Sequence, residues 1–142
     1  MDIPETLVEL VAEFEGFKAE AYQDIGGVWT CGYGTTGPDI HKGTTFTKEE
    51  ALQRLSETLQ SIWNQIEQKT SIALTSKQME ALSSFAYNLG TSALFKSTLW
   101  KYLEEGEIEQ AAQEFPKWSH VNGKVITGLL KRRVKEQELF LS

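Results

Sequence analysis

Cysteine is nearly absent from this sequence, and long apolar runs are absent altogether. The one cysteine among 142 residues, Cys31, cannot form an internal disulfide, so nothing in the fold depends on an oxidising compartment. No apolar run approaches membrane-spanning length, and acidic residues stand near the N-terminus where a signal peptide carries basic ones. We therefore expect synthesis in the cytoplasm without a signal peptide, and no stable insertion into a membrane.

Positive charge is also in short supply. The chain has 14 basic and 20 acidic residues, which gives a formal net charge of −6. Nucleic acids and acidic membranes bind proteins through a basic field, so neither is an expected partner. The length, and a 40% share of apolar residues, suit one ordinary domain over residues 1–142 with a core of its own.

Apolar residues recur at helical spacing along most of the chain. Two segments, 47–50 and 75–78, have the capping-box pattern that begins a helix. Asn122-Gly123 marks a tight turn before the last helix. The predicted helices cover residues 3–15, 47–68, 75–90, 97–105, 107–115 and 129–141.

Between residues 18 and 47 the apolar pattern changes to a period of two, and Gly26-Gly27 is suited to a hairpin turn. We interpret this segment as a small antiparallel sheet, so the predicted fold class is α+β and predominantly helical. Thr30 and Gly32 fall on one face of the sheet, where a missing side chain lets a ligand approach the backbone. This face is the expected floor of a cleft.

Three polar residues in this part of the chain can carry chemistry. Glu15 ends the first predicted helix, where the negative end of the helix dipole favours the protonated acid that a proton donor needs. Asp24 precedes the glycine turn, and Thr30 lies on the following strand. Each taken singly is more often structural: a solvated helix-end glutamate, a turn aspartate and a strand threonine.

The spacing of these residues is more informative than any one of them. The aspartate is nine positions after the glutamate, and the threonine is six positions after the aspartate. Gly-Tyr-Gly begins two positions after the threonine. The surrounding pattern, EGxxxxAYxDxxGxxTxGYG, resembles the catalytic segment of the phage-type lysozymes, the endolysins of glycoside hydrolase family 24. The resemblance continues through residues 74–90, 97–99 and 128–133, and covers the chain from about Leu7 to Phe140.

The resemblance implies a lysozyme-like fold and a muramidase reaction. It implies a β lobe at about 18–47, a connecting helix at about 48–68, and a helical lobe of 1–16 and about 70–142, with a cleft between the lobes. The substrate would be the β-1,4 bond between N-acetylmuramic acid and N-acetylglucosamine in peptidoglycan. Glu15 would protonate the glycosidic oxygen, Asp24 would stabilise the transition state or help activate water, and Thr30 would position that water.

Other positions match residues that line the glycan cleft in the family. These are Thr36, Tyr87, Asn88 and Thr98, with Trp118 a weaker candidate. Aromatic faces and amides suit N-acetyl sugars, although Tyr87 is equally well explained as core and Asn88 as a helix-end residue. We expect Arg132 and Arg133 to be structural, because a cation close to Glu15 would oppose its role as an acid.

One position departs from the family pattern. Thr35 stands where the family commonly has a histidine after Gly-Tyr-Gly, which puts local hydrogen bonding in doubt more than chemistry. His41 is an alternative source of an imidazole in this region, although a lone loop histidine is usually solvated.

Two other functions on the same fold stay open at this point. One is a peptidoglycan-binding module without turnover, and the other is a lytic transglycosylase, which has no need of Thr30. For all three functions we expect peptidoglycan glycan strands as partner, a monomer, and neither cofactor nor metal. Action on the cell wall or in the periplasm then requires release by a separate holin, or delivery as part of a particle.

Overall fold

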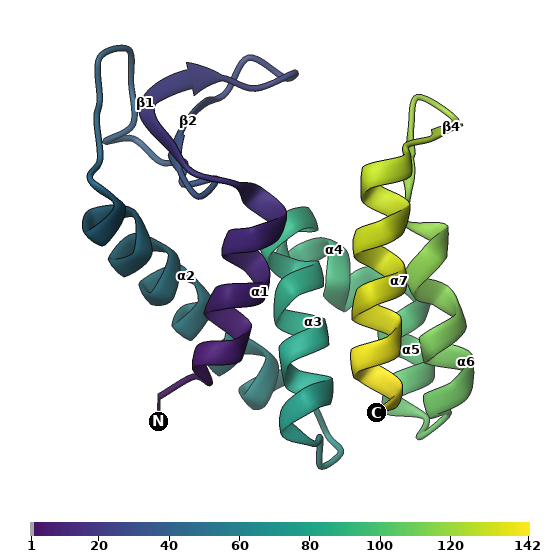
Figure 1. Ribbon diagram of the computed structural model, residues 1–142. Coiled ribbons are helices and arrows are strands. Elements are labelled where there is room, and N and C mark those ends of the chain that lie inside the picture. Colours follow the sequence, from purple (N-terminus) through teal and green to yellow (C-terminus); the bar gives the residue numbers. More distant parts are fainter. Residues whose placement is uncertain (1) are drawn as a thin grey trace. The chain divides into compact units, whose positions relative to one another are not determined.

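The computed structural model describes residues 2–142 and is built mainly of helices (Figure 1). The elements in chain order are α1 (Glu5–Glu15), β1 (Lys18–Gln23), β2 (Trp29–Gly32), α2 (Lys48–Lys69), α3 (Ser76–Leu89), α4 (Thr91–Lys96), α5 (Thr98–Glu104), α6 (Ile108–Glu114), the 3-10 helix η1 (Phe115–Lys117), β3 (His120–Val121), β4 (Lys124–Val125) and α7 (Thr127–Leu141). The predicted α+β class is confirmed. The helix α4 and the short β3–β4 hairpin were not predicted as separate elements.

The chain divides into two compact units, one ending at Ser61 and the other beginning at Ile62. The boundary falls inside α2, which is one continuous helix. The predicted assignment of residues 1–16 and about 70–142 to one lobe, with a cleft beside it, stays a prediction. Among residues 2–142, none of the helices combines the length and the apolar character needed to cross a bilayer.

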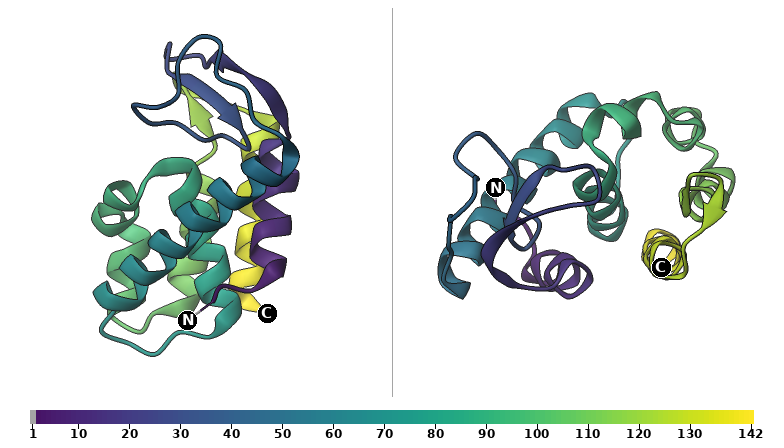
Figure 2. Two further views of the ribbon diagram at one scale, coloured as in Figure 1. Left: turned by 90° about the vertical axis from the view of Figure 1, so that its left-hand side faces the viewer. Right: turned by 90° about the horizontal axis from the view of Figure 1, so that it is seen from above.

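The first unit contains the β hairpin. Strands β1 and β2 run side by side in antiparallel orientation (Figure 2), and Tyr22 lies opposite Thr30 while Gln23 lies opposite Trp29. The pairing is irregular between Lys18 and Tyr22, as expected where a bulge bends a strand. The hairpin therefore sets which side chains of β1 stand beside those of β2.

The predicted role of Gly32 is wrong. A Cβ atom at Gly32 would lie 3.0 Å from the Cβ of Ala51 and 3.0 Å from the ring of Phe46, and the residue has φ +67°. The missing side chain thus admits the protein's own α2 against β2, and not a ligand. The pattern of small residues correctly located a close approach, but what fills the space is a helix.

The loop that follows β2 is tied to α2 by charge. Arg54 donates to both carboxylate oxygens of Asp39, at 2.7 and 3.3 Å, and its guanidinium lies 5.5 Å from the centre of the Phe46 ring. The hydrogen bond from Arg54 lowers the pKa of Asp39. At the start of α2 the predicted capping box is present, because Glu50 N–H donates to Thr47 Oγ1 and Thr47 N–H donates to Glu50 Oε1.

The second unit is a group of helices around a set of aromatic side chains. Helices α3 and α7 run side by side (Figure 1), and Phe85 on α3 contacts the rings of Phe115 and Trp118 edge-on. Phe140 on α7 contacts Phe115, with ring centres 5.3 Å apart. The second predicted capping box, formed by Thr75 and Gln78, begins α3. Phe85, Phe115 and Phe140 are almost fully buried, so this cluster is the centre of the unit's core.

A buried ionic network joins α3 to α7. The Glu136 carboxylate lies 2.8 Å from Arg133 Nε and 3.3 Å from Arg132 Nε, and it accepts a hydrogen bond of 2.5 Å from Ser84 Oγ. Arg132 also donates to the backbone carbonyl of Ser84 at 3.0 Å. Burial raises the pKa of Glu136, and the two guanidinium groups counteract this effect. The two arginines that were predicted to be structural thus pair with a carboxylate of their own helix.

Candidate active site

Glu15 lies at the junction between α1 and β1. It is the last residue of α1 and is half-buried. Gly16 follows with φ +72°, a conformation that L side chains rarely adopt, and its N–H donates to Ala12 O at 2.9 Å. The conformation of Gly16 therefore ends α1 at Glu15, and the Glu15 side chain lies where the chain turns from the helix into β1.

Asp24 and Thr30 are both anchored to one residue of the hairpin turn, Val28. Asp24 Oδ1 accepts a hydrogen bond of 2.9 Å from Val28 N–H, and Asp24 N–H donates to Val28 O at 2.9 Å. Thr30 Oγ1 donates to the same carbonyl oxygen at 3.0 Å. These bonds fix the carboxyl group of Asp24 and the hydroxyl of Thr30 on the same turn, so their relative positions depend on the hairpin.

Tyr22 on β1 has a raised pKa. Burial raises the pKa of this tyrosine, and the charges of Glu15 and Asp24 raise it further. Glu15, Asp24 and Thr30 all belong to the first unit, where Asp24 and Thr30 share Val28 as a hydrogen-bond partner. That the three form one catalytic group stays a prediction.

Thr35 is buried within the same unit. Its side chain oxygen has no hydrogen-bond partner among residues 2–142, while its backbone N–H and C=O both pair with Cys31 at 2.9 Å. His41 is exposed, and its Nδ1 lies 3.1 Å from Lys42 O. The Thr35 hydroxyl therefore lacks the hydrogen bond that a buried polar side chain normally makes.

The four predicted glycan-binding residues are divided between the two units. Thr36 is exposed in the first unit. Tyr87 and Asn88 are half-buried in the last turn of α3, and Thr98 is exposed in the first turn of α5, all in the second unit. That these four residues line one cleft with Glu15, Asp24 and Thr30 stays a prediction.

Asn88 differs from its neighbours in one respect. Its side-chain oxygen is buried and has no hydrogen-bond partner in the described part of the chain. A buried acceptor without a donor is unfavourable, and a ligand N–H or O–H group can satisfy it. Trp118, the weaker candidate, is half-buried and packs edge-on against Phe85, so packing accounts for at least part of its surface.

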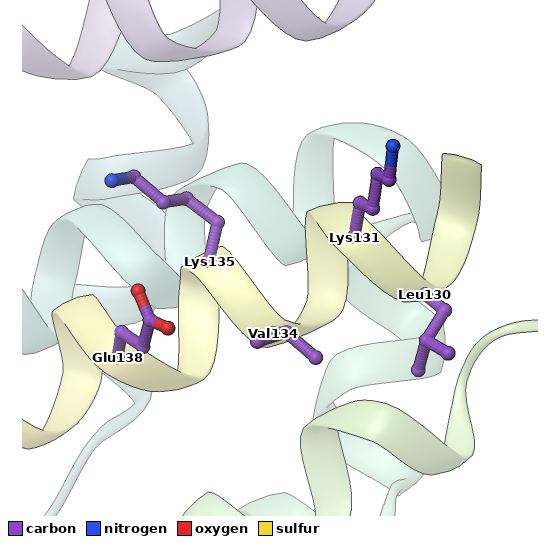
Figure 3. A pocket seen from close by; sticks show the side chains of 5 residues that line it. All are labelled: Leu130, Lys131, Val134, Lys135 and Glu138. Atoms are coloured by element: carbon purple, nitrogen blue, oxygen red, sulfur yellow. The ribbon is translucent and has the colours of Figure 1, made fainter. Parts of the chain in front are cut away.

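A surface groove along α7 does not have the groups that hydrolysis needs. It has a volume of about 340 Å³ and is lined by Leu130, Lys131, Val134, Lys135 and Glu138. Figure 3 shows Lys131 and Lys135 on the same side of the helix. Glycoside hydrolysis ordinarily uses two carboxyl groups, and this groove has one. The helix–hairpin segment with Glu15 and Asp24 is therefore the better candidate site.

The family model of phage lysozymes matches residues 12–136, a range that contains Glu15, Asp24 and Thr30 and most of both units. The chain belongs to the phage lysozyme family. This confirms the resemblance stated from the sequence pattern.

Individual members and structures agree with this membership in the phage lysozyme family. The endolysin of Bacillus phage B103 is 38% identical over 144 residues, covering 100% of this chain and 55% of that protein. The endolysin of Acyrthosiphon pisum secondary endosymbiont phage 1 is 38% identical and is covered over 99% of its length. The muramidase domain of SpmX from Asticaccaulis excentricus superposes with a TM-score of 0.90 at 34% identity, covering 99% of this chain and 97% of that one.

These matches confirm the lysozyme-like fold. The chain spans about half the length of the Bacillus phage endolysins, but nearly the whole length of the endosymbiont phage endolysin.

Proposed function

We propose that the chain is a muramidase of the phage lysozyme family that hydrolyses the β-1,4 bond between N-acetylmuramic acid and N-acetylglucosamine in peptidoglycan. The observation that carries the proposal is the helix–hairpin segment, which holds two carboxyl groups and a threonine hydroxyl within one unit of a chain of this family. The biological use is lysis of the host cell or penetration of its wall.

The hydrogen bonds of the hairpin support a division of roles. Glu15, at the helix end, donates its proton to the leaving glycosidic oxygen, and Asp24 provides negative charge beside the oxocarbenium-like transition state. The proton of Thr30 Oγ1 is already directed to Val28 O. A water molecule bound to Thr30 therefore donates its hydrogen to the hydroxyl oxygen. The lone pairs of this water then face away from Thr30 and toward the anomeric carbon that it attacks.

Replacing Thr30 with valine tests the water-positioning role. We expect Thr30→Val to lower kcat roughly tenfold to a hundredfold, since a misplacement of about 1 Å in a reacting group can cost about a hundredfold. Thr30→Ser keeps the hydroxyl and should retain most of the activity. Steady-state hydrolysis of soluble glycan strands measures both variants, and equal rates for valine and serine would refute the role.

Product analysis on purified peptidoglycan tests the reaction type. Hydrolysis releases muropeptides with reducing N-acetylmuramic acid ends, which mass spectrometry distinguishes from the anhydro ends that a lytic transglycosylase leaves. Reducing ends are the expected result. Anhydro ends would assign the transglycosylase reaction, and an absence of released muropeptides would assign a binding module without turnover.

The proposed partner is the glycan strand of the cell wall, where the protein acts as a monomer after release from the cytoplasm. Neither metal nor cofactor enters the proposed mechanism, because two carboxyl groups and a water molecule complete the proton transfers. Release depends on a separate holin or on delivery within a particle. Size-exclusion chromatography with light scattering measures the monomer directly.

A further inference from the structure

Charge is unevenly distributed between the two compact units. The first unit has 4 basic and 11 acidic residues, whereas the second has 10 basic and 9 acidic ones. Within the second unit, residues 115–135 contain six basic residues and no acidic one. This stretch runs from η1 through the β3–β4 hairpin into α7. The excess of negative charge thus belongs to the first unit, and the second unit has one locally basic segment.

Half of the basic residues in this segment are neutralised by the protein itself. Three of them pair with glutamates of the second unit, and these are Lys117, Arg132 and Arg133. The other three, Lys124, Lys131 and Lys135, are exposed and form no ion pair among residues 2–142. The segment therefore presents three cations to solvent whose charge no neighbouring carboxylate offsets.

Two of these lysines line the groove along α7. Lys131 and Lys135 are four residues apart, a spacing that places side chains as neighbours on one side of a helix. Figure 3 shows them along one edge of α7, with Leu130 and Val134 along the other and Glu138 at the end of the groove. The lining is thus an apolar strip beside two cations, with a single anion at its end.

This lining suits a slender polymer in which anionic groups alternate with uncharged carbon chain. Lysine binds phosphate as a point charge, and its flexible stem lets it follow successive phosphate groups. Leu130 and Val134 offer apolar surface to the carbon atoms between those groups. Nucleic acid is a poor match, because binding it takes a broad basic field and the chain has a net charge of −6. A single linear polyanion needs only the width of the groove.

We propose that the α7 groove binds the phosphodiester-linked anionic polymer that many bacterial walls carry on their peptidoglycan, through Lys131 and Lys135. This inference rests on the proposed function, because the wall that is the substrate also carries the polymer. The groove is a surface of the second unit, whereas Glu15, Asp24 and Thr30 belong to the first. Binding there retains the protein on the wall and takes no part in cleaving the glycosidic bond.

The test compares Lys131→Gln/Lys135→Gln with the control Lys77→Gln/Lys101→Gln in calorimetric titrations with isolated poly(glycerol phosphate). Each double variant removes two exposed lysines of the second unit, so both change the net charge equally and should keep the wild-type Tm. We expect the groove variant to bind the polymer roughly tenfold to thirtyfold more weakly than wild type, the sum for two lysines beside an anionic partner. Its Kd should also depend less on salt concentration, while the control should match wild type.

Three outcomes would overturn the proposal. Equal Kd values for wild type and the groove variant would show that the groove does not bind the polymer. An equal loss in the control variant would assign the binding to net charge alone. Tighter binding of wild type to phosphatidylglycerol vesicles than to the polymer would assign the groove to a lipid surface.

Hydrolysis of soluble glycan strands, which lack the polymer, separates this inference from the proposed function. Both double variants should hydrolyse these strands at the wild-type rate, because neither changes the helix–hairpin segment. A wild-type protein that hydrolyses the strands but does not bind the polymer refutes the inference alone. One that binds the polymer but leaves the strands intact refutes the proposed function and keeps the groove as a polymer-binding site.

Discussion

Glu15→Gln should abolish the loss of turbidity that the wild-type protein causes in a peptidoglycan suspension. Glutamine has nearly the same shape as glutamic acid but has no acidic proton to give to the leaving oxygen. General acid catalysis contributes typically 10²–10⁴-fold to a rate, and we expect a loss of about that size. Substrate binding should persist, because the substitution keeps the volume of the side chain, so the variant should still sediment with cell walls.

Glu13→Gln is the matched control for this experiment. Glu13 lies on the same helix, two residues before Glu15, and it is exposed. The control makes the same chemical change and alters the net charge by the same amount, and its rate should equal that of wild type. An unchanged rate in Glu15→Gln, or an equal loss in both variants, would rule out Glu15 as the specific proton donor.

Glu136→Ala should be the most destabilising single change in the second unit. Glu136 is fully buried and forms ion pairs with two buried arginines, Arg132 and Arg133. Removing one member of a buried ion pair typically costs about 3–5 kcal/mol, because the remaining charge keeps its desolvation penalty without its partner. Chemical denaturation of the purified protein measures this as a lower free energy of unfolding.

Two further variants separate charge from packing at this position. Glu136→Gln keeps the volume and a hydrogen-bonding group for Ser84, so we expect a smaller loss than for alanine. Glu138→Ala removes an exposed glutamate from the same helix and should change the free energy of unfolding by about 0.5 kcal/mol or less. Equal stabilities of Glu136→Ala and Glu138→Ala would mean that the network contributes little.

Local sequence signals predicted much of the fold correctly. The capping boxes at Thr47 and Thr75 placed the starts of α2 and α3, because each threonine side chain accepts a hydrogen bond from the backbone N–H three residues later, which has no acceptor within the helix. The end of α1 at Gly16 followed from a backbone conformation that suits glycine. Such features depend on neighbours in the chain, so a pattern of a few residues is sufficient to predict them.

Features that depend on distant contacts could not be derived in this way. Gly32 was correctly identified as a place of close approach, but only the packing of Ala51 shows that the approaching group is α2. Ser84 and Glu136 are 52 residues apart, and no local pattern indicates that they share a hydrogen bond. The proposed site was predictable although no single residue of it is informative, because Glu15, Asp24 and Thr30 are close in sequence and their spacing forms a recognisable pattern.

The buried position of Cys31 makes the chain well suited to site-specific labelling. Its thiol has no solvent exposure and lies 3.5 Å from the carbonyl oxygen of Ala19, and the sequence contains no other cysteine. A maleimide or spin label therefore reacts with an introduced surface cysteine in preference to the native one. One such cysteine in each compact unit, for example at the exposed positions Glu57 and Glu109, lets fluorescence or spectroscopic distance measurements follow the two units as substrate binds.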